Sequence, residues 1–273
     1  MVIFPNAKIN IGLSVIRKRN DGFHDIESIF YPIGLCDSLE YLETKDTSAI
    51  DIASVTYSGP FPVTGKDICI KLTEMLRDLF SFPALRIHIH KNIPSGAGLG
   101  GGSSDAAFLL KSLNSRYSFE LNQSQLEELA SRIGSDCPFF IKNNPCLVTG
   151  KGEVLQEIHL SLKGYYLILI YPGTQVSTAE AYREIIPSDK SPNLRELARE
   201  PVNQWKYLIS NQFEDSVFRS YPPLSEIRKE LYSMGALYAS MTGSGSAIYG
   251  LFSSEVNIPK QFSDYFIFRE WLQ

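Results

Sequence analysis

Hydrophobic and polar residues alternate along several short segments of the chain, a pattern that predicts β-strands with one buried face. In residues 6–15, NAKINIGLSV, apolar side chains alternate with Lys8, Asn10 and two small residues, so Lys8 and Asn10 are expected side by side on the face opposite the core. Similar alternation, or a continuous apolar run, predicts further strands at 27–33, 38–44, 49–57, 85–90, 165–171, 236–241, 247–252 and 264–270.

Apolar residues spaced three to four positions apart predict helices between these strands. The predicted helices cover 67–80, 105–113, 124–133 and 177–182, with two or three more between 193 and 233. Ser103 or Ser104 is expected to cap the second helix, and Ser-x-x-Glu capping boxes begin at Ser124 and Ser177. This mixture of strands and helices predicts an α+β protein with two halves that meet near the turn TGKGEV at 149–154.

Composition narrows the class of protein. The 273 residues suit one large domain or two modest ones, and the charges sum to 26 − 30 = −4, which gives no basic surface for nucleic acid or an anionic membrane. The four cysteines are scattered without a Cys-x-x-Cys pair, which favours reduced thiols and a cytoplasmic location. The apolar run at 165–171 is far shorter than the ~20 residues of a membrane helix, so we expect no membrane partner.

The segment NIPSGAGLGGGSSDAA, residues 92–107, holds five glycines between positions 96 and 102, although glycine is the costliest residue to order. Three of them match the dinucleotide pattern GxGxxG, but no parallel strand with an acidic residue follows the next helix. The P-loop Lys-Ser/Thr pair and the protein-kinase HRD and DFG elements are also missing from the sequence. A strand, a glycine turn and a helix start remain, which is typical of a phosphate site; a flexible loop or a close-packed helix start is the alternative.

Three segments, in order along the chain, resemble the motifs of the GHMP kinases, which phosphorylate small molecules. They are PNAKINIGL at 5–13, PSGAGLGGGSSDAA at 94–107 and MTGSGSAIYGLF at 241–252. Five segments resemble one branch of the family more narrowly: AKINIGL, DGFHDIESIFYPIGLCDSL, GLGGGSSDAA, GSDCPFF and NQFEDSVF. That branch phosphorylates the 2-hydroxyl of an alcohol that carries cytidine diphosphate, on the non-mevalonate route to isoprenoid precursors.

The resemblance implies a fold and partners that composition alone does not. It implies an N-terminal ATP-binding domain over 1–155, similar to domain 2 of ribosomal protein S5, and a ferredoxin-like C-terminal domain over 156–273. ATP and Mg²⁺ are the implied cofactors, and a small molecule with a cytidine diphosphate moiety is the implied substrate. A monomer and a homodimer both remain open. Another GHMP small-molecule kinase, or a catalytically silent nucleotide-binding module of the same fold, is the alternative function.

The implied ATP site is the glycine loop, whose backbone N–H groups would hold the triphosphate. Its residues are Pro94, Ser95, Gly96, Ala97, Gly98, Leu99, Gly100, Gly101, Gly102, Ser103 and Ser104. The resemblance places Ser104 near Mg²⁺ and leaves the other metal ligands unknown. The family commonly has asparagine at the position of Asp67, and a carboxylate there cannot donate to an adenine ring nitrogen.

Two residues are implied as catalytic, Lys8 and Asp136. On the residues alone, Lys8 is typical of a solvated strand lysine, and Asp136, before Cys137 and Pro138, of a helix N-cap. The resemblance instead places the lysine beside the aspartate and the reacting hydroxyl.

The remaining implied site residues bind the substrate. Asn10 would hold the substrate or Lys8, and the glycine turn after strand 236–241 would hold the substrate or the phosphate loop through Thr242 and Gly243. Cytosine recognition would fall to Phe23, His24 and Tyr182, of which Phe23 departs from the tyrosine expected. Aromatic packing in a turn is the plain alternative for that group. His88 and His90 share a strand face without other ligands nearby, so we interpret both as surface or structural residues.

Overall fold

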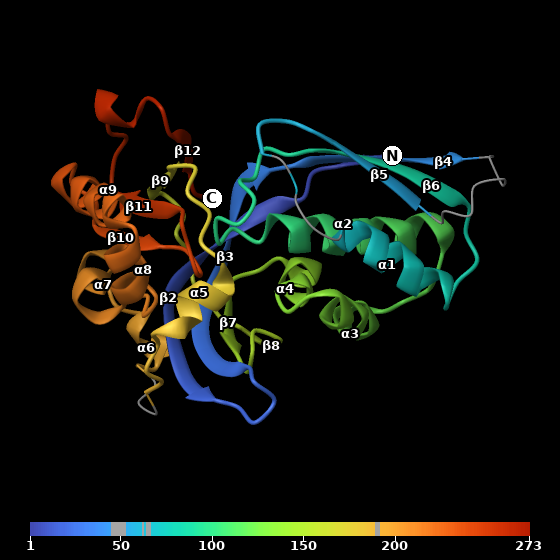
Figure 1. Ribbon diagram of the computed structural model, residues 1–273, viewed down its shortest axis with the longest axis horizontal. Helices are drawn as coiled ribbons and strands as arrows, with labels where there is room; N and C mark the ends of the chain where they lie inside the picture. The colour runs from blue at the N-terminus through green and yellow to red at the C-terminus, as the bar shows by residue number, and fades with distance from the viewer. Residues whose placement is uncertain (45–52, 62, 64–66, 189–191) are drawn as a thin grey trace. The chain divides into compact units, whose positions relative to one another are not determined.

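The computed structural model describes residues 1–44, 53–61, 63, 67–188 and 192–273, and it mixes helices and strands (Figure 1). Two compact units emerge from its contacts. Unit 1 contains Met1–Ala7, Leu35–Ser95 and Gly100–Asn144, and unit 2 contains Lys8–Gly34, Gly96–Leu99 and Pro145–Gln273. The predicted α+β class is confirmed, whereas the domain boundary expected at residue 155 stays a prediction, because these units interleave along the chain.

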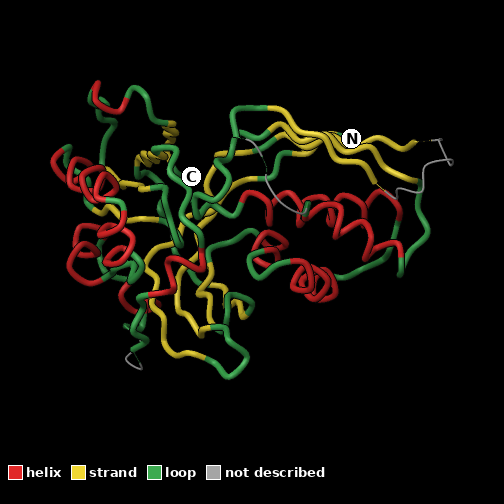
Figure 2. Tube along the Cα trace, in the orientation of Figure 1, coloured by secondary structure: helices red, strands yellow, loops and turns green. Residues whose placement is uncertain are grey.

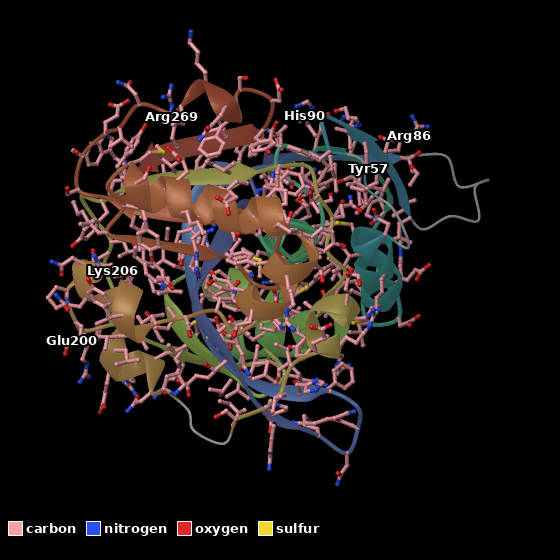
Figure 3. The ribbon with its side chains drawn as sticks, turned by 60° about the vertical axis from the view of Figure 1, so that its left-hand side comes forward. Tyr57, Arg86, His90, Glu200, Lys206 and Arg269 are labelled. Carbon is pink, nitrogen blue, oxygen red and sulfur yellow. The ribbon has the colours of Figure 1, made fainter. Side chains whose placement is uncertain are left out.

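Unit 1 is built on a four-stranded sheet with the strand order β1-β4-β6-β5. Its strands are β1 (Val2–Ile3), β4 (Ser38–Thr44), β6 (Ala84–His90) and β5 (Ala53–Ser58). The alternation along β6 buries Leu85, Ile87 and Ile89, while Arg86 and His90, labelled in Figure 3, are exposed. The strands predicted at 38–44 and 85–90 are confirmed; for the one predicted at 49–57, residues 49–52 lie outside the described residues.

Helices α1 (Ile68–Arg77) and α2 (Gly101–Tyr117) run along one face of this sheet (Figures 1 and 2). Two further helices, α3 (Gln123–Ile133) and α4 (Cys137–Lys142), complete unit 1. Asp67 caps α1 by accepting hydrogen bonds from two backbone N–H groups of the first turn, at 2.7 and 2.9 Å. The helices expected at 67–80, 105–113 and 124–133 are therefore present, with shifted ends.

Two predicted helix caps are wrong. Helix α2 begins at Gly101, ahead of both serines, and its N-cap is Gly100, which has a φ of 72° and no side chain that could form a capping hydrogen bond. Helix α3 is capped by Asn122, two residues ahead of Ser124, and the side chain of Gln125 completes the capping box, so both N–H groups have acceptors. In each case several polar residues preceded the helix, and spacing alone did not select among them.

Beside the start of α2, a lysine and two aspartates form a buried ion cluster. The Lys91 ammonium donates to Asp105 at 2.6 Å and to Asp37, and the exposed fraction of these side chains is 3% or less. Asp37 also accepts from the N–H groups of Asn92 and Ile93, at 2.7 and 2.8 Å, so it fixes the chain that enters the glycine loop. This cluster joins β4, β6 and α2 within unit 1.

Unit 2 contains two four-stranded sheets, with the orders β2-β3-β7-β8 and β10-β11-β9-β12. The strands are β2 (Asn6–Lys18), β3 (His24–Cys36), β7 (Cys146–Thr149), β8 (Val154–Glu157), β9 (Tyr166–Tyr171), β10 (Tyr238–Met241), β11 (Ile248–Phe252) and β12 (Phe266–Trp271). Six of these match predicted strands, while β7 and β8, each of four residues, are too short for periodicity to reveal.

Strand β2 corrects one expectation about burial. Its residues from Ala7 to Leu13 are all buried, including Lys8 at 3% and Asn10 at 2% exposed, so the strand has no solvated face there. The side chain of Phe30 and the Thr242 turn cover the polar face, which a period-two pattern could not reveal. Lys8 is therefore not the solvated lysine that its sequence position suggests.

Helices complete unit 2. They are α5 (Thr178–Arg183), α6 (Leu194–Leu197), α7 (Val202–Leu208), α8 (Glu214–Ser220) and α9 (Pro222–Ser233), with a 3₁₀ turn at Lys260–Phe262. Ser177 caps α5 by accepting from Glu180 N, as predicted. Four helices, not two or three, occupy 193–233. Along the described stretches of chain, no helix is both long and apolar enough to span a bilayer.

The buried ion cluster makes stability depend on pH. Burial raises the pKa of Asp105 to about 8, because the attraction of Lys91 is opposed by the neighbouring Asp37. In the unfolded chain this pKa is about 3.9. Between these values the folded state keeps a proton that the unfolded state has lost, so the free energy of unfolding falls as pH rises.

We therefore expect Asp105→Asn to gain stability relative to the parent between pH 5 and pH 8, by about 1 kcal/mol or more. Urea denaturation at each pH unit measures this difference. The exposed Asp264→Asn is the control and should show no such trend. If the difference in stability between the parent and Asp105→Asn stays constant from pH 5 to pH 8, Asp105 does not retain a proton in the folded state over this range.

Candidate active site

The glycine loop has a backbone that only glycine adopts easily. Gly96, Gly98 and Gly100 have φ values of 68°, 78° and 72°, in the left-handed region. Residues 96–99 belong to unit 2, whereas 94–95 and 100–104 belong to unit 1. Directly after Gly100, the first turn of α2 presents N–H groups that have no acceptor within a helix.

Ser104, in that first turn, is buried with its hydroxyl unused. Its side chain is 0% exposed, and Oγ has no hydrogen-bond partner among the described residues. Asp105 Oδ1 is in the same condition. Because buried polar atoms normally have partners, an unpaired hydroxyl at a helix start fits a phosphate oxygen or a cation.

Gly98 lies against the turn that follows β10. A Cβ atom at this position would lie 2.0 Å from the carbonyl oxygen of Thr242, which a side chain cannot tolerate. Thr242 Oγ1 in turn lies 3.1 Å from Gly98 O, within donating distance. Gly243 is also close, since its own Cβ would lie 3.3 Å from Gly98 O. The structure thus brings three predicted site residues, Gly98, Thr242 and Gly243, into contact within unit 2.

Lys8 is held against the same point of the loop. Its Nζ donates to Gly98 O at 2.8 Å and to Asn10 Oδ1 at 2.5 Å, and it lies 4.6 Å from the centroid of the Phe30 ring. Its backbone N–H donates to Leu99 O at 3.0 Å. Two neutral oxygens therefore orient a buried ammonium group beside the glycine loop.

Asn10 connects the lysine to the turn. Its Nδ2 donates to Ser28 Oγ at 2.8 Å, its backbone N–H donates to Thr242 Oγ1 at 3.0 Å, and its carbonyl accepts from Tyr249 at 2.8 Å. Of the two roles considered for Asn10, the one seen in this geometry is holding the lysine. Its contact with a substrate stays a prediction.

Asp136 occupies the N-cap position of α4, but its side chain makes no capping hydrogen bond. The predicted N-cap position is therefore confirmed without its capping hydrogen bond, because the φ and ψ of −83° and −13° are helical, whereas a capping side chain needs an extended backbone. Pro138 opens the helix as expected. Asp136 belongs to unit 1 and Lys8 to unit 2, and the juxtaposition implied by the resemblance stays a prediction.

The residues expected to bind cytosine are close to one another in unit 2. The rings of His24 and Tyr182 stack, with 4.6 Å between centroids and 20° between planes. Phe23 is 54% exposed, and the Lys151 ammonium lies 4.9 Å from its ring centroid. Burial, together with the charge of Lys18, lowers the pKa of His24, so the ring is neutral near pH 7. A neutral imidazole keeps one donor and one acceptor nitrogen for a base edge.

Four supporting residues were not predicted. Ser28 and Tyr249 hold Asn10, and Asn211 and Glu214 contact the backbone of β10 and its turn. All four lie in or beside the segments that resemble family motifs, which was the available signal. Their partners are distant in sequence, so no local pattern indicated what they contact.

Comparison with known proteins places this geometry in a family. Two family models match, GHMP kinases N terminal domain over residues 67–144 and GHMP kinases C terminal over 192–265. A 4-diphosphocytidyl-2-C-methyl-D-erythritol kinase of Bacteroides fragilis is 46% identical over 263 residues, 95% of each chain. The chain belongs to the GHMP kinases.

Further matches define the branch of the GHMP kinases. The kinase of the same name from Parabacteroides distasonis is 46% identical over 269 residues and 98% of each chain. A crystal structure of 4-(cytidine 5'-diphospho)-2C-methyl-D-erythritol kinase matches with a TM-score of 0.74 at 33% identity, covering 92% of this chain and 90% of the other. This GHMP kinase is an ATP-dependent small-molecule kinase of that branch, and its two-domain α+β fold is confirmed.

A GHMP kinase needs no preformed metal cage. Within the described ranges, no group of three or more His, Cys, Asp or Glu residues could hold a metal ion. Mg²⁺ in kinase sites typically keeps several waters and is held by one or two carboxylates together with substrate phosphates. Ser104, with its unused buried hydroxyl, is the residue here that fits such an ion or the phosphate it accompanies.

The contact of Gly98 with Thr242 predicts the effect of adding one methyl group. Gly98→Ala forces the loop and the turn apart, so we expect at least a tenfold loss of kcat/KM. We also expect a loss of stability about 1–3 kcal/mol greater than that of Gly164→Ala. Gly164 is the matched control, because its φ of 86° carries the same strain while nothing lies within 4 Å of its Cβ position. Urea denaturation and ATP turnover measure both effects; equal losses in the two variants would show that the contact is unimportant.

Proposed function

We propose that this kinase transfers the γ-phosphoryl group of ATP to the 2-hydroxyl of 4-diphosphocytidyl-2-C-methyl-D-erythritol, a step on the non-mevalonate route to isoprenoid precursors. The observation that carries the proposal is the buried Lys8 ammonium, oriented by Asn10 and Gly98 at the glycine loop. Relatives of that name, 46% identical over nearly the whole chain, support the choice of substrate.

The glycine loop would bind the triphosphate. Phosphate oxygens need several donors, and the first turn of α2 supplies N–H groups at the positive end of a 17-residue helix. Ser104 would give its unpaired hydroxyl to a phosphate oxygen or to Mg²⁺. When bound, Mg²⁺ would neutralise the negative charge that develops on the transferred phosphoryl group.

Lys8 and Asp136 would act on the acceptor hydroxyl. In the transfer, the hydroxyl oxygen forms a bond to the γ-phosphorus, the bond to the β,γ-bridging oxygen breaks, and ADP leaves. We assign the hydroxyl proton to the carboxylate of Asp136. Lys8 would stabilise the negative charge that develops on the oxygen, because Asn10 Oδ1 and Gly98 O hold its ammonium at the glycine loop.

Substrate selection would depend on the aromatic residues of unit 2. Tyr182 and His24 stack with each other here, so a cytosine ring would join or replace that stack. Phe23, which is exposed and has the Lys151 ammonium over its ring, would supply a second aromatic face for the base. Stacking survives the replacement of the expected tyrosine by Phe23, whereas a phenolic hydrogen bond does not. Thr242 and Gly243 would hold the reacting end of the substrate or the phosphate loop.

We also infer a cytoplasmic location, because Cys69 and Cys137 are buried thiols, as is usual in a reducing compartment. Burial raises the pKa of Cys137 to about 12, which makes this neighbour of Asp136 inert as a nucleophile.

Removing either assigned catalytic group should lower turnover without unfolding the protein. We expect Lys8→Ala and Asp136→Asn each to reduce kcat by roughly 10²-fold or more. The exposed Lys163→Ala and Asp264→Asn are matched controls and should keep parental rates. Coupled ADP-release kinetics with the cytidyl substrate measure the change. Near-parental activity of Asp136→Asn would remove it from the mechanism, and a parent that phosphorylates other alcohols but not this one would support another GHMP kinase.

The aromatic group predicts a change in substrate affinity and not in ATP affinity. Because stacking on a base contributes about 1–3 kcal/mol, Tyr182→Ala should raise KM for the cytidyl substrate about tenfold or more. KM for ATP should change less than twofold. Tyr182→Phe keeps the ring and serves as the control. If Tyr182→Ala raises both KM values equally, the ring is structural and not part of a base site.

A further inference from the structure

Asn211 fixes the backbone on both sides of Thr242. Its Nδ2 donates to Met241 O and to Gly243 O, each at 2.8 Å, and its Oδ1 accepts from Phe213 N at 3.0 Å. The side chain is 2% exposed. Both amide hydrogens are therefore used on the two carbonyl groups that flank Thr242.

Glu214 binds the backbone N–H of Met241, the residue whose carbonyl accepts from Asn211. Its Oε1 accepts from Met241 N at 2.7 Å and from Ser240 Oγ at 3.0 Å, and its Oε2 pairs with Arg228. Met241 is the last residue of β10. The carbonyl of Met241 is thus bound by Asn211 and its N–H by Glu214, at the point where the strand gives way to the glycine turn.

The segment that carries Asn211 is also attached to the strand that carries Lys8. Leu13 N donates to Ser210 O at 3.0 Å, and Gln212 N donates to Leu13 O at 2.8 Å. The side chain of Gln212 adds a bond from Val15 N at 2.7 Å. Residues 210–212 therefore run parallel to β2 and keep a fixed register with it.

These contacts form a continuous path to Lys8. Thr242 Oγ1 accepts from Asn10 N at 3.0 Å and lies within donating distance of Asn10 Oδ1 and Gly98 O, at 3.2 and 3.1 Å. Lys8 donates to both of those oxygens. A shift of Thr242 would therefore move two acceptors that help orient the ammonium.

We propose that Asn211 and Glu214 are positioning residues for phosphoryl transfer, which place the Thr242 turn so that Lys8 is aimed at the reacting group. This inference rests on the proposed function of Lys8. Neither side chain touches substrate; each acts through the backbone of Met241 or Gly243. A reacting group misplaced by about 1 Å can cost 10²-fold in rate, so the effect belongs in kcat and not in binding.

The test is steady-state kinetics of Asn211→Ala in the full chain, with ATP and the cytidyl substrate varied in turn. We expect kcat to fall roughly 10²-fold while both KM values stay within about threefold. Asn211→Ser, which keeps one donor, should recover part of the lost rate. If Asn211→Ala does not fold, the same kinetics are measured on Asn211→Ser.

Asn114→Ala is the matched control, because the side-chain amide of Asn114 also holds backbone atoms. Its Nδ2 donates to Leu121 O and its Oδ1 accepts from Leu121 N, each at 3.1 Å. It lies near the C-terminal end of α2 and should lower the melting temperature without lowering kcat. Equal kcat losses in the two variants, or parallel rises in both KM values, would overturn the inference. So would an unchanged kcat in Asn211→Ala. Absence of turnover in the unchanged protein would instead overturn the proposed function, and the inference with it.

Discussion

The hydrogen bonds of the buried Lys8 ammonium are the constraint on which unit 2 depends around the glycine loop. Moving an ammonium group out of water costs several kcal/mol, so its acceptors must be fixed in place. Asn10 Oδ1 and Gly98 O are among these acceptors. Asn10 is oriented by Ser28 and by Thr242, and Gly98 can approach Thr242 only because it has no Cβ atom. The glycine is thus required for close approach at least as much as for its left-handed φ.

The glycines also explain why the serines that follow them do not cap α2. Gly100 ends the loop in the left-handed region and lets the helix start one residue later, ahead of both serines. The hydroxyl of Ser104 is then buried without a partner among the described residues, an arrangement that costs free energy. A site that binds an anion or its cation regains that free energy when it is filled.

Periodicity predicted the strands of this protein where a strand has one solvated face, as in β6. It failed for burial in β2, because the cover on the polar face comes from Phe30 and Thr242, one of them more than 230 positions away in sequence. It also missed β7 and β8, whose four residues hold too few alternations. The N-cap of α3 was misassigned because Asn122 and Ser124 offer the same local chemistry, and only the observed geometry distinguishes them.

The resemblance to the GHMP kinases identified the candidate site residues, and the structure shows which of them contact one another within each unit. Two lysines illustrate what a sequence could not distinguish, since both are about 2–3% exposed. Lys91 lies between the side chains of Asp37 and Asp105, and these two neighbours raise the pKa of Lys91 in spite of its burial. The charge of Lys91 is thus balanced by acidic side chains of its own unit, and the cluster stabilises the entry to the glycine loop. Lys8 donates to an amide oxygen and a backbone carbonyl, which hold its ammonium beside the glycine loop, where a positive charge suits a group that responds to charge developing on a substrate.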